Sequence, residues 1–347
     1  MRVAVLNNCV PFLEGGAEHL ADALVIKLRE YGHQATLVRV PFRWNPPEKI
    51  LDHMLACRLM RLPNVDLAVA FKFPAFYIPH PNKVLWILHQ FRQAYDLWGT
   101  PYQDLPDSLR GTTIRDAIIK ADNTYFREAR KIYTNSTVTG DRLRRFNGID
   151  SEVLLPPLLQ DAMYMSKPHE DFIVCPGRVN GAKRQLLLVQ AMKHCRTAVK
   201  LVVAGKPETE ADREGINKEI AAAGLAGRVT FIDRFITDEE KVDLLSRCLA
   251  AAYIPYDEDS YGYVTLEACL SHKAVITCTD SGGIDMLVRE GDTGFITAPE
   301  PKALAAAMDR LYDNKPKTIA MGDRAFEHAA SFGINWDTVI KTLTTTA

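Results

Sequence analysis

Short apolar runs alternate with longer helical patterns along almost the whole chain, and this alternation restricts the possible folds more than any other feature. In the first half, the runs typical of strands are residues 2–6, 35–40, 67–70, 84–88, 131–133 and 153–155. The helical stretches between them include residues 17–31, 113–130 and 138–146. Strands that alternate with helices are typical of βαβ units and parallel sheets. We therefore expect an α/β protein.

The alternation pauses at residues 156–171, where three prolines and several polar residues indicate a linker. It then restarts, with strands expected at residues 172–175, 200–204, 229–232, 249–254 and 274–277 and helices from about 301 to 343. A chain of 347 residues can bury two cores. We predict two Rossmann-like, doubly wound parallel-sheet domains that face each other across a cleft. They cover residues 1–157 and 158–347, and whether the final helices pack back on the first domain stays open.

Composition excludes several classes of protein. The net charge of -1 gives no reason to expect a nucleic-acid partner, which needs a basic face. The seven cysteines are odd in number and lack paired CxxC spacing, which argues against a disulfide framework or a zinc site. No apolar run approaches membrane-spanning length. We predict a cytoplasmic protein, with peripheral contact at the cytoplasmic face of the membrane left open.

Acidic residues bracket a strand-to-helix turn in segment 257–283. Three acids, residues 257–259, follow an apolar run that ends at Pro255, and Glu267 lies on a short helix-like stretch eight positions after Asp259. In an open parallel sheet, ligands bind outside the carboxyl ends of the strands. We therefore expect these acids to reach a bound molecule.

This segment resembles the signature of the retaining glycosyltransferases of the GT-B fold, specifically glycosyltransferase family 4. The matching run is Asp259-Ser260-Tyr261-Gly262-Tyr263-Val264-Thr265-Leu266-Glu267-Ala268. The first acid of the family is usually glutamate, so its role stays open among Asp257, Glu258 and Asp259. The resemblance implies that Glu267 accepts hydrogen bonds from the ribose of a nucleotide sugar. It also implies that Asp259 and the backbone of the turn hold the transferred sugar.

Two cations lie five positions apart on the turn after the first strand of the second half. Arg178 and Lys183 can converge on one diphosphate, and a helix N-terminus behind them adds N–H donors. The alternative is that both are solvated charges at a helix start. The family carries an arginine and a lysine at this spacing, and the resemblance implies that they neutralise the departing nucleotide diphosphate.

Three residues of the first half complete the predicted site. Gly15 and Gly16 lie between the first strand and the first helix, where glycine lets a phosphate or sugar approach backbone N–H groups. The alternative is an ordinary tight turn. His89 ends an apolar run and can bond a sugar hydroxyl or a phosphate oxygen, although a histidine at a strand end is more often structural. The family commonly has a glycine pair and a histidine at these points. Gln90 stands where many relatives have an acid.

Residues 257–259 also match the D-x-D motif of metal-dependent GT-A transferases, which holds a divalent cation on the diphosphate. Arg178 and Lys183 would make that cation redundant, and the single-domain GT-A architecture does not suit this two-part chain. We therefore expect neither a metal nor a cofactor.

Together these patterns predict an enzyme, a metal-independent retaining glycosyltransferase. It would move a sugar from a nucleotide diphosphate sugar to an acceptor hydroxyl on a glycan, a glycolipid or a small molecule. Two alternatives are a GT-B nucleotide-sugar epimerase and an inactive subunit that binds sugar nucleotides. The amphipathic stretch 47–62 could lie on a membrane that carries a lipid-linked acceptor, but we favour a helix packed on its own sheet.

Overall fold

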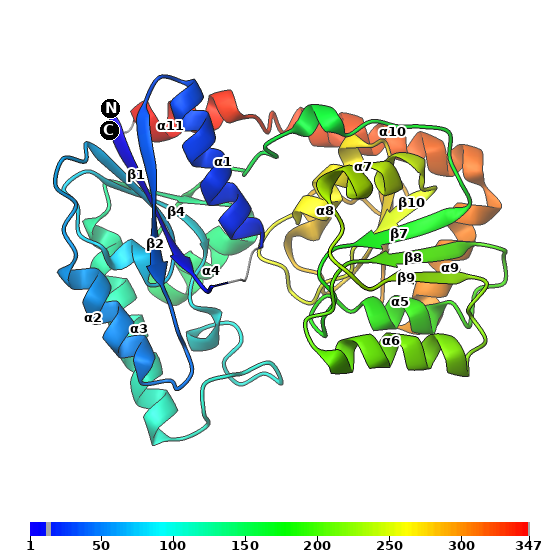
Figure 1. Ribbon diagram of the computed structural model, residues 1–347, viewed down its shortest axis with the longest axis horizontal. Helices are drawn as coiled ribbons and strands as arrows, with labels where there is room; N and C mark the ends of the chain where they lie inside the picture. The colour runs from blue at the N-terminus through cyan, green and yellow to red at the C-terminus, as the bar shows by residue number, and fades with distance from the viewer. Residues whose placement is uncertain (12–14, 346–347) are drawn as a thin grey trace. The chain divides into compact units, whose positions relative to one another are not determined.

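The computed structural model describes residues 1–11 and 15–345, which divide into two compact units. Unit 1 comprises Met1–Leu159 and Ile334–Ala347, and unit 2 comprises Gln160–Gly333. Each unit is a parallel sheet flanked by helices (Figure 1).

Unit 1 is built on a six-stranded sheet in the order β2-β1-β3-β4-β5-β6, with every neighbouring pair parallel. Its strands are β1 (Arg2–Cys9), β2 (Gln34–Pro41), β3 (Leu67–Lys72), β4 (Lys83–His89), β5 (Lys131–Thr134) and β6 (Glu152–Val153). Its helices are α1 (Gly16–Glu30), α2 (Lys49–Leu59), α3 (Leu109–Tyr125), α4 (Thr137–Asn147) and α11 (Trp336–Thr345).

Both faces of this sheet are buried, because alternate strand residues point to opposite sides. Val3 and Val5 of β1 pack in one core cluster with Leu24 of α1 and Trp336 of α11. Their neighbour Ala4 belongs to the other cluster, which includes side chains of α2, α3 and α4. The C-terminal helix α11 therefore completes the core of unit 1, and Figure 1 shows it beside α1.

Unit 2 has a second six-stranded parallel sheet, in the order β12-β11-β10-β7-β8-β9. Its strands are β7 (Phe172–Pro176), β8 (Lys200–Ala204), β9 (Val229–Ile232), β10 (Ala250–Ala252), β11 (Ala274–Cys278) and β12 (Gly294–Thr297). Its helices are α5 (Gln185–Ala191), α6 (Glu210–Ala222), α7 (Asp238–Arg247), α8 (Tyr263–Leu270), α9 (Pro301–Asp313) and α10 (Lys315–Ser331).

The strand order of unit 2 contains a topological switch. From β7 the chain moves outward through β8 to β9, and it then returns to place β10 on the other side of β7. The loops after β7 and β10 therefore leave the sheet at neighbouring strands and lead in opposite directions, which opens a crevice for a ligand in folds of this kind. Both loops carry residues of the predicted site.

The predicted α/β class with two doubly wound sheets is confirmed. Strand boundaries differ in detail, since the run 249–254 is a strand only at Ala250–Ala252 and the last strand of unit 1 is Glu152–Val153. Strand β12 was not expected, because its four residues begin with Gly294, contain no long apolar run and follow a charged turn with another glycine at position 291. Among residues 1–11 and 15–345, no helix is both long and apolar enough to cross a bilayer.

Candidate donor site at the topological switch of unit 2

Lys183 lies in the loop between β7 and α5 and is held by two groups that follow β10. Its Nζ lies 2.7 Å from the hydroxyl oxygen of Tyr253 and forms an ion pair with the carboxylate of Glu258. Burial alone would lower the pKa of Lys183, but Tyr253 and Glu258 outweigh it and raise the pKa. The ammonium therefore stays charged at neutral pH. Tyr253 Oη also lies 3.0 Å from Glu258 Oε2.

Arg178 lies in the same loop between β7 and α5, and its side chain is more exposed to solvent than that of Lys183. Its side chain is 46% exposed, against 24% for Lys183. Among residues 1–11 and 15–345, its one ionic contact is a long one, 3.8 Å from Nη1 to Glu208 Oε1. The two predicted cations are thus brought to one edge of the sheet, and Arg178 is the more easily redirected to a ligand.

The acids after β10 form a loop that is joined by backbone bonds to the loop after β11. We call residues 257–260 the acid loop and residues 281–283 the glycine turn. The amide of Glu258 donates to the carbonyl of Ser281 at 3.2 Å, and the amide of Gly283 donates to the carbonyl of Glu258 at 3.0 Å. A Cβ on Gly282 would lie 2.2 Å from the Glu258 carbonyl oxygen, so only glycine permits this approach. The glycine turn is therefore built together with the acid loop.

The turn that follows leads into α8 through another required glycine. Gly262 has φ of 68°, and a Cβ there would lie 2.3 Å from Cε1 of Tyr253. Tyr261 is fully buried, and Ser260 Oγ accepts a long hydrogen bond of 3.4 Å from the amide of Gly262. Elsewhere in unit 2 the helices α6 and α7 begin with complete capping boxes. No described side chain caps α8, so its first N–H groups face the turn without such a partner.

Glu267 of α8 is buried, and its two carboxylate oxygens have different surroundings. Oε1 lies 2.6 Å from Nζ of Lys241 on α7, with the Glu267 side chain only 5% exposed. Oε2 is buried and accepts no hydrogen bond that meets ordinary geometry from any described residue. Burial raises the pKa of Tyr164, as do the charge of Glu267 and a hydrogen bond from the Tyr164 hydroxyl to that carboxylate. A buried acceptor without a well-placed donor is costly, so Oε2 is suited to bond a hydroxyl of a ligand.

The predicted residues of unit 1 lie where its own strands end. His89 is the last residue of β4, and its Nδ1 lies 2.6 Å from the carbonyl oxygen of Gln90. Gly16 opens α1, and Gly15 has an extended backbone with φ of -155°, which any residue adopts. The backbone at Gly15 therefore does not by itself require glycine. The carboxylate of Glu18, one turn into α1, lies 2.9 Å from Nζ of Lys72 at the end of β3.

Several residues that shape this site were missed from the sequence. They are Tyr253, which faces Lys183, Lys241, which pairs with Glu267, and Arg184 with Asp280, which are described below. Tyr253 is the next-to-last residue of the expected strand 249–254, and its place at the carboxyl end of that strand was a signal for a site residue. The pairings of Lys241 and Asp280 join segments far apart in the chain, and no local pattern indicates them.

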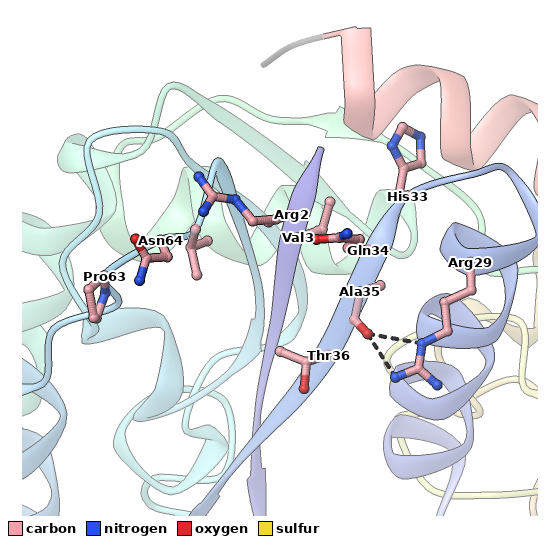
Figure 2. Close-up of a pocket in the computed structure, with 10 residues that line it drawn as sticks. Arg2, Val3, Arg29, His33, Gln34, Ala35, Thr36, Pro63 and Asn64 are labelled. Carbon is pink, nitrogen blue, oxygen red and sulfur yellow. Dashed lines mark hydrogen bonds between the residues drawn. The ribbon is translucent and has the colours of Figure 1, made fainter.

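A separate depression of about 610 Å³ lies in unit 1 at the opposite edge of the sheet (Figure 2). Arg2, Gln34 and Val65 line it at the amino ends of β1, β2 and β3. Arg2 is paired with Asp66, and Arg29 donates two bonds to the carbonyl of Ala35. Its cations are thus engaged, and it lies away from the carboxyl ends of the strands where this fold binds ligands.

Comparison with known proteins identifies relatives of unit 2. Residues 163–328, nearly the whole of unit 2, match the family model described as Glycosyl transferases group 1. Among curated proteins, D-inositol 3-phosphate glycosyltransferase of Streptomyces coelicolor is 30% identical over 176 residues, which are 48% of this chain and 37% of that protein. Alpha-1,3/1,6-mannosyltransferase ALG2 of Mus musculus is 30% identical over 116 residues, 33% of this chain and 27% of that protein. The matched region thus spans well under half of these relatives.

Solved structures match over nearly the full length. Alr3699/HepE of Anabaena, crystallised in complex with UDP and glucose, gives a TM-score of 0.75 at 17% identity and covers 99% of this chain and 100% of its own. Sucrose-phosphate synthase of Thermosynechococcus elongatus gives a TM-score of 0.77 at 16% identity, with 99% and 97% covered. At this identity the likeness establishes the fold.

The fold and the site define a protein of the GT-B class, with two doubly wound sheets and charged groups at the switch of the second. The chain has the fold of these GT-B glycosyltransferase structures, and its residues 163–328 match the glycosyl transferases group 1 family.

Proposed function

We propose that this protein is a retaining, metal-independent glycosyltransferase that moves a sugar from a nucleotide diphosphate sugar to an acceptor hydroxyl. The observation that carries the proposal is the placement of Lys183, Arg178 and Glu267 around the topological switch of unit 2. The family match of unit 2 supports it. The solved relative Alr3699/HepE binds UDP and UDP-glucose, which favours a nucleotide sugar as donor here as well.

The chemistry follows from charge. When the bond between sugar and diphosphate breaks, negative charge grows on the departing oxygens. Lys183 is fixed, charged and partly buried, so it stabilises that charge more strongly than a solvated lysine would. Arg178 adds a fork of N–H donors from the same loop. Because two cations meet the diphosphate, the proposed reaction needs no metal ion.

Donor binding must rearrange one contact. Glu258 pairs with the ammonium of Lys183, and a bound diphosphate would replace Glu258 as the partner of that ammonium. Glu258 is then released beside Asp259, where either acid can bond hydroxyls of the transferred sugar. Glu267 receives the ribose on Oε2, while Lys241 holds and orients the carboxylate through Oε1. His89, Gly15 and Gly16 are assigned to the sugar and acceptor through the family resemblance.

A lipid-linked acceptor is a second candidate, favoured by helix α2. Only Ile50 and Cys57 of this helix are buried, which agrees with packing on its own sheet. Leu51, Leu55 and Leu59, spaced by four, are 37%, 60% and 66% exposed. Arg58 is paired with Glu128, so binding to a membrane would rest mainly on the leucines. Co-sedimentation with lipid vesicles should be lost in a Leu55→Gln/Leu59→Gln variant if this acceptor is correct.

We also propose a cytoplasmic location, which suits the seven free cysteines and a nucleotide-sugar donor. The function is tested with a thermal-shift panel of UDP-, GDP- and ADP-sugars, because a ligand that binds only the folded state raises the melting temperature. Product formed from the stabilising donor is then analysed by NMR. An α-glycoside from an α-linked donor supports retention, and a β-glycoside contradicts it. Release of an altered free sugar without an acceptor would instead indicate an epimerase.

A further inference from the structure

Arg184, the residue after Lys183, has an unusual backbone conformation. It precedes α5 with φ of 58° and ψ of 30°, a left-handed conformation that residues with a side chain seldom adopt. Such a conformation persists where surrounding contacts hold it, and it directs attention to those contacts.

The side chain of Arg184 is nearly buried, at 12% exposure, and its guanidinium bonds two loops at once. Nε donates to the carbonyl of Ile254 and Nη2 to the carbonyl of Pro255, both at 2.7 Å. Nη1 and Nη2 each lie 2.8 Å from one carboxylate oxygen of Asp280, which makes a bidentate pair. A longer contact of 3.4 Å reaches Ser281 Oγ.

These partners stand at the base of the acid loop and of the glycine turn. Ile254 and Pro255 follow β10 and lead into the acid loop, while Asp280 and Ser281 follow β11 and lead into the glycine turn. The two loops are also joined directly, because the amide of Asp257 donates to the carbonyl of Asp280 at 2.8 Å. Arg184 therefore joins the Lys183 loop, the acid loop and the glycine turn.

We propose that Arg184 and Asp280 are positioning residues that fix the acid loop relative to Lys183 and so align the transferred sugar with the departing diphosphate. Neither side chain needs to touch the donor. The inference rests on the proposed function and adds to it a pair outside the family motif. Since Lys183 itself is held by Tyr253 and by its own loop, loss of the pair should disturb the sugar position more than nucleotide binding.

The test compares Arg184→Lys, Arg184→Gly and Asp280→Asn with wild type. Lysine keeps the charge without the bidentate fork, and glycine keeps the left-handed backbone without the side chain. We expect kcat to fall at least tenfold in each, with Kd for UDP changed less than threefold. The double variant Arg184→Gly/Asp280→Asn should be no slower than the slower single variant, because both remove the same contact. The matched control is Arg228→Lys, since Arg228 donates to the carbonyls of Thr197 and Val199 at the opposite edge of the sheet.

Unchanged kcat in folded Arg184→Gly and Arg184→Lys would overturn the proposal. So would a parallel loss of kcat, UDP affinity and melting temperature, which a merely structural role produces. Amide hydrogen exchange gives a readout independent of turnover. The amides of Glu258 and Gly283 should lose protection in Arg184→Gly and keep it in Arg228→Lys. If the wild type transfers no sugar from any donor, the proposed function fails. Retained protection in Arg184→Gly would then still refute the positioning role of Arg184, and lost protection would support it.

Discussion

The ammonium of Lys183 and the carboxylate of Glu258 form an ion pair, although they belong to loops that follow different strands of unit 2. The pair links the predicted diphosphate site to the acid loop. The carboxylate of Glu258 therefore pairs with the same ammonium that is proposed to bind the diphosphate.

Glu258→Gln should strengthen binding of a free nucleoside diphosphate, because it removes a competing anion from Lys183. An ion pair of this partly exposed kind contributes about 0.2–1 kcal/mol, so Kd should fall by up to about fivefold. Calorimetric titration measures it. Glu170→Gln is the matched control, since Glu170 is paired with Arg247 just before β7, at the amino edge of the same sheet. A higher Kd in Glu258→Gln than in wild type would mean that this acid helps to bind the nucleotide.

Arg178→Ala and Lys183→Ala should each slow sugar transfer by orders of magnitude, since one lost transition-state donor typically costs about 3–4 kcal/mol. We expect the larger loss at Lys183, the more buried of the two cations. Steady-state kinetics with the matched donor decides it, with Lys193→Ala as a control for the loss of a surface lysine paired with Glu219. Near wild-type rates in both site variants would refute the role of Arg178 and Lys183 in stabilising the departing diphosphate.

Activity should survive incubation with EDTA, because side chains meet the charge of the diphosphate. The assay is run with and without added Mg²⁺ or Mn²⁺ after chelation. Loss of activity that either ion restores would revive the D-x-D interpretation of residues 257–259 and contradict this part of the account.

The stability of unit 1 should fall as pH rises from about 4 to 7. Asp122 of α3 is fully buried and is bonded by Tyr77 and Tyr95, and burial raises its pKa to about 7 against these bonds. An unfolded aspartate has a pKa of about 3.9. Between these values only the folded state holds the proton, so raising pH favours unfolding by up to about 1.4 kcal/mol per pH unit.

Asp122→Asn should remove this slope, and Asp116→Asn, an exposed change on the same helix, should keep it. All four tryptophans lie in unit 1, so their fluorescence during denaturant unfolding reports this unit alone. Equal slopes in Asp122→Asn and wild type would show that Asp122 does not carry the effect.

Local patterns in the sequence were sufficient for the layers of the fold and for the loops that carry the site. Short apolar runs located the strands other than β12, and the position of Arg178, Lys183 and Glu267 after strands indicated one edge of a sheet. The pairings within the site could not be predicted in this way. Lys241 meets Glu267, and Arg184 meets Asp280, across 26 and 96 positions in the chain. Such contacts depend on strand order, which no local pattern contains.

The left-handed backbone at Arg184 was equally hidden. Arginine carries no local signal for that conformation, whereas glycine at position 262 does, and there φ is 68°. The sequence also left open which of the acids in residues 257–259 serves as the first acid of the family motif. In the structure Glu258 is the one paired with Lys183.

The central claim is that the switch of unit 2 binds a nucleotide diphosphate sugar, with Glu267 on the ribose and Asp259 on the sugar. Calorimetric titration of wild type, Glu267→Gln and Asp259→Asn with UDP, GDP and ADP tests it most directly. We predict that wild type binds at least one of them, that Glu267→Gln weakens this binding about tenfold by losing a charge-assisted bond of 1.5–3 kcal/mol in rough magnitude, and that Asp259→Asn leaves it unchanged while lowering turnover. No binding of any nucleotide to wild type, or a selective loss of binding in Asp259→Asn, would contradict the account.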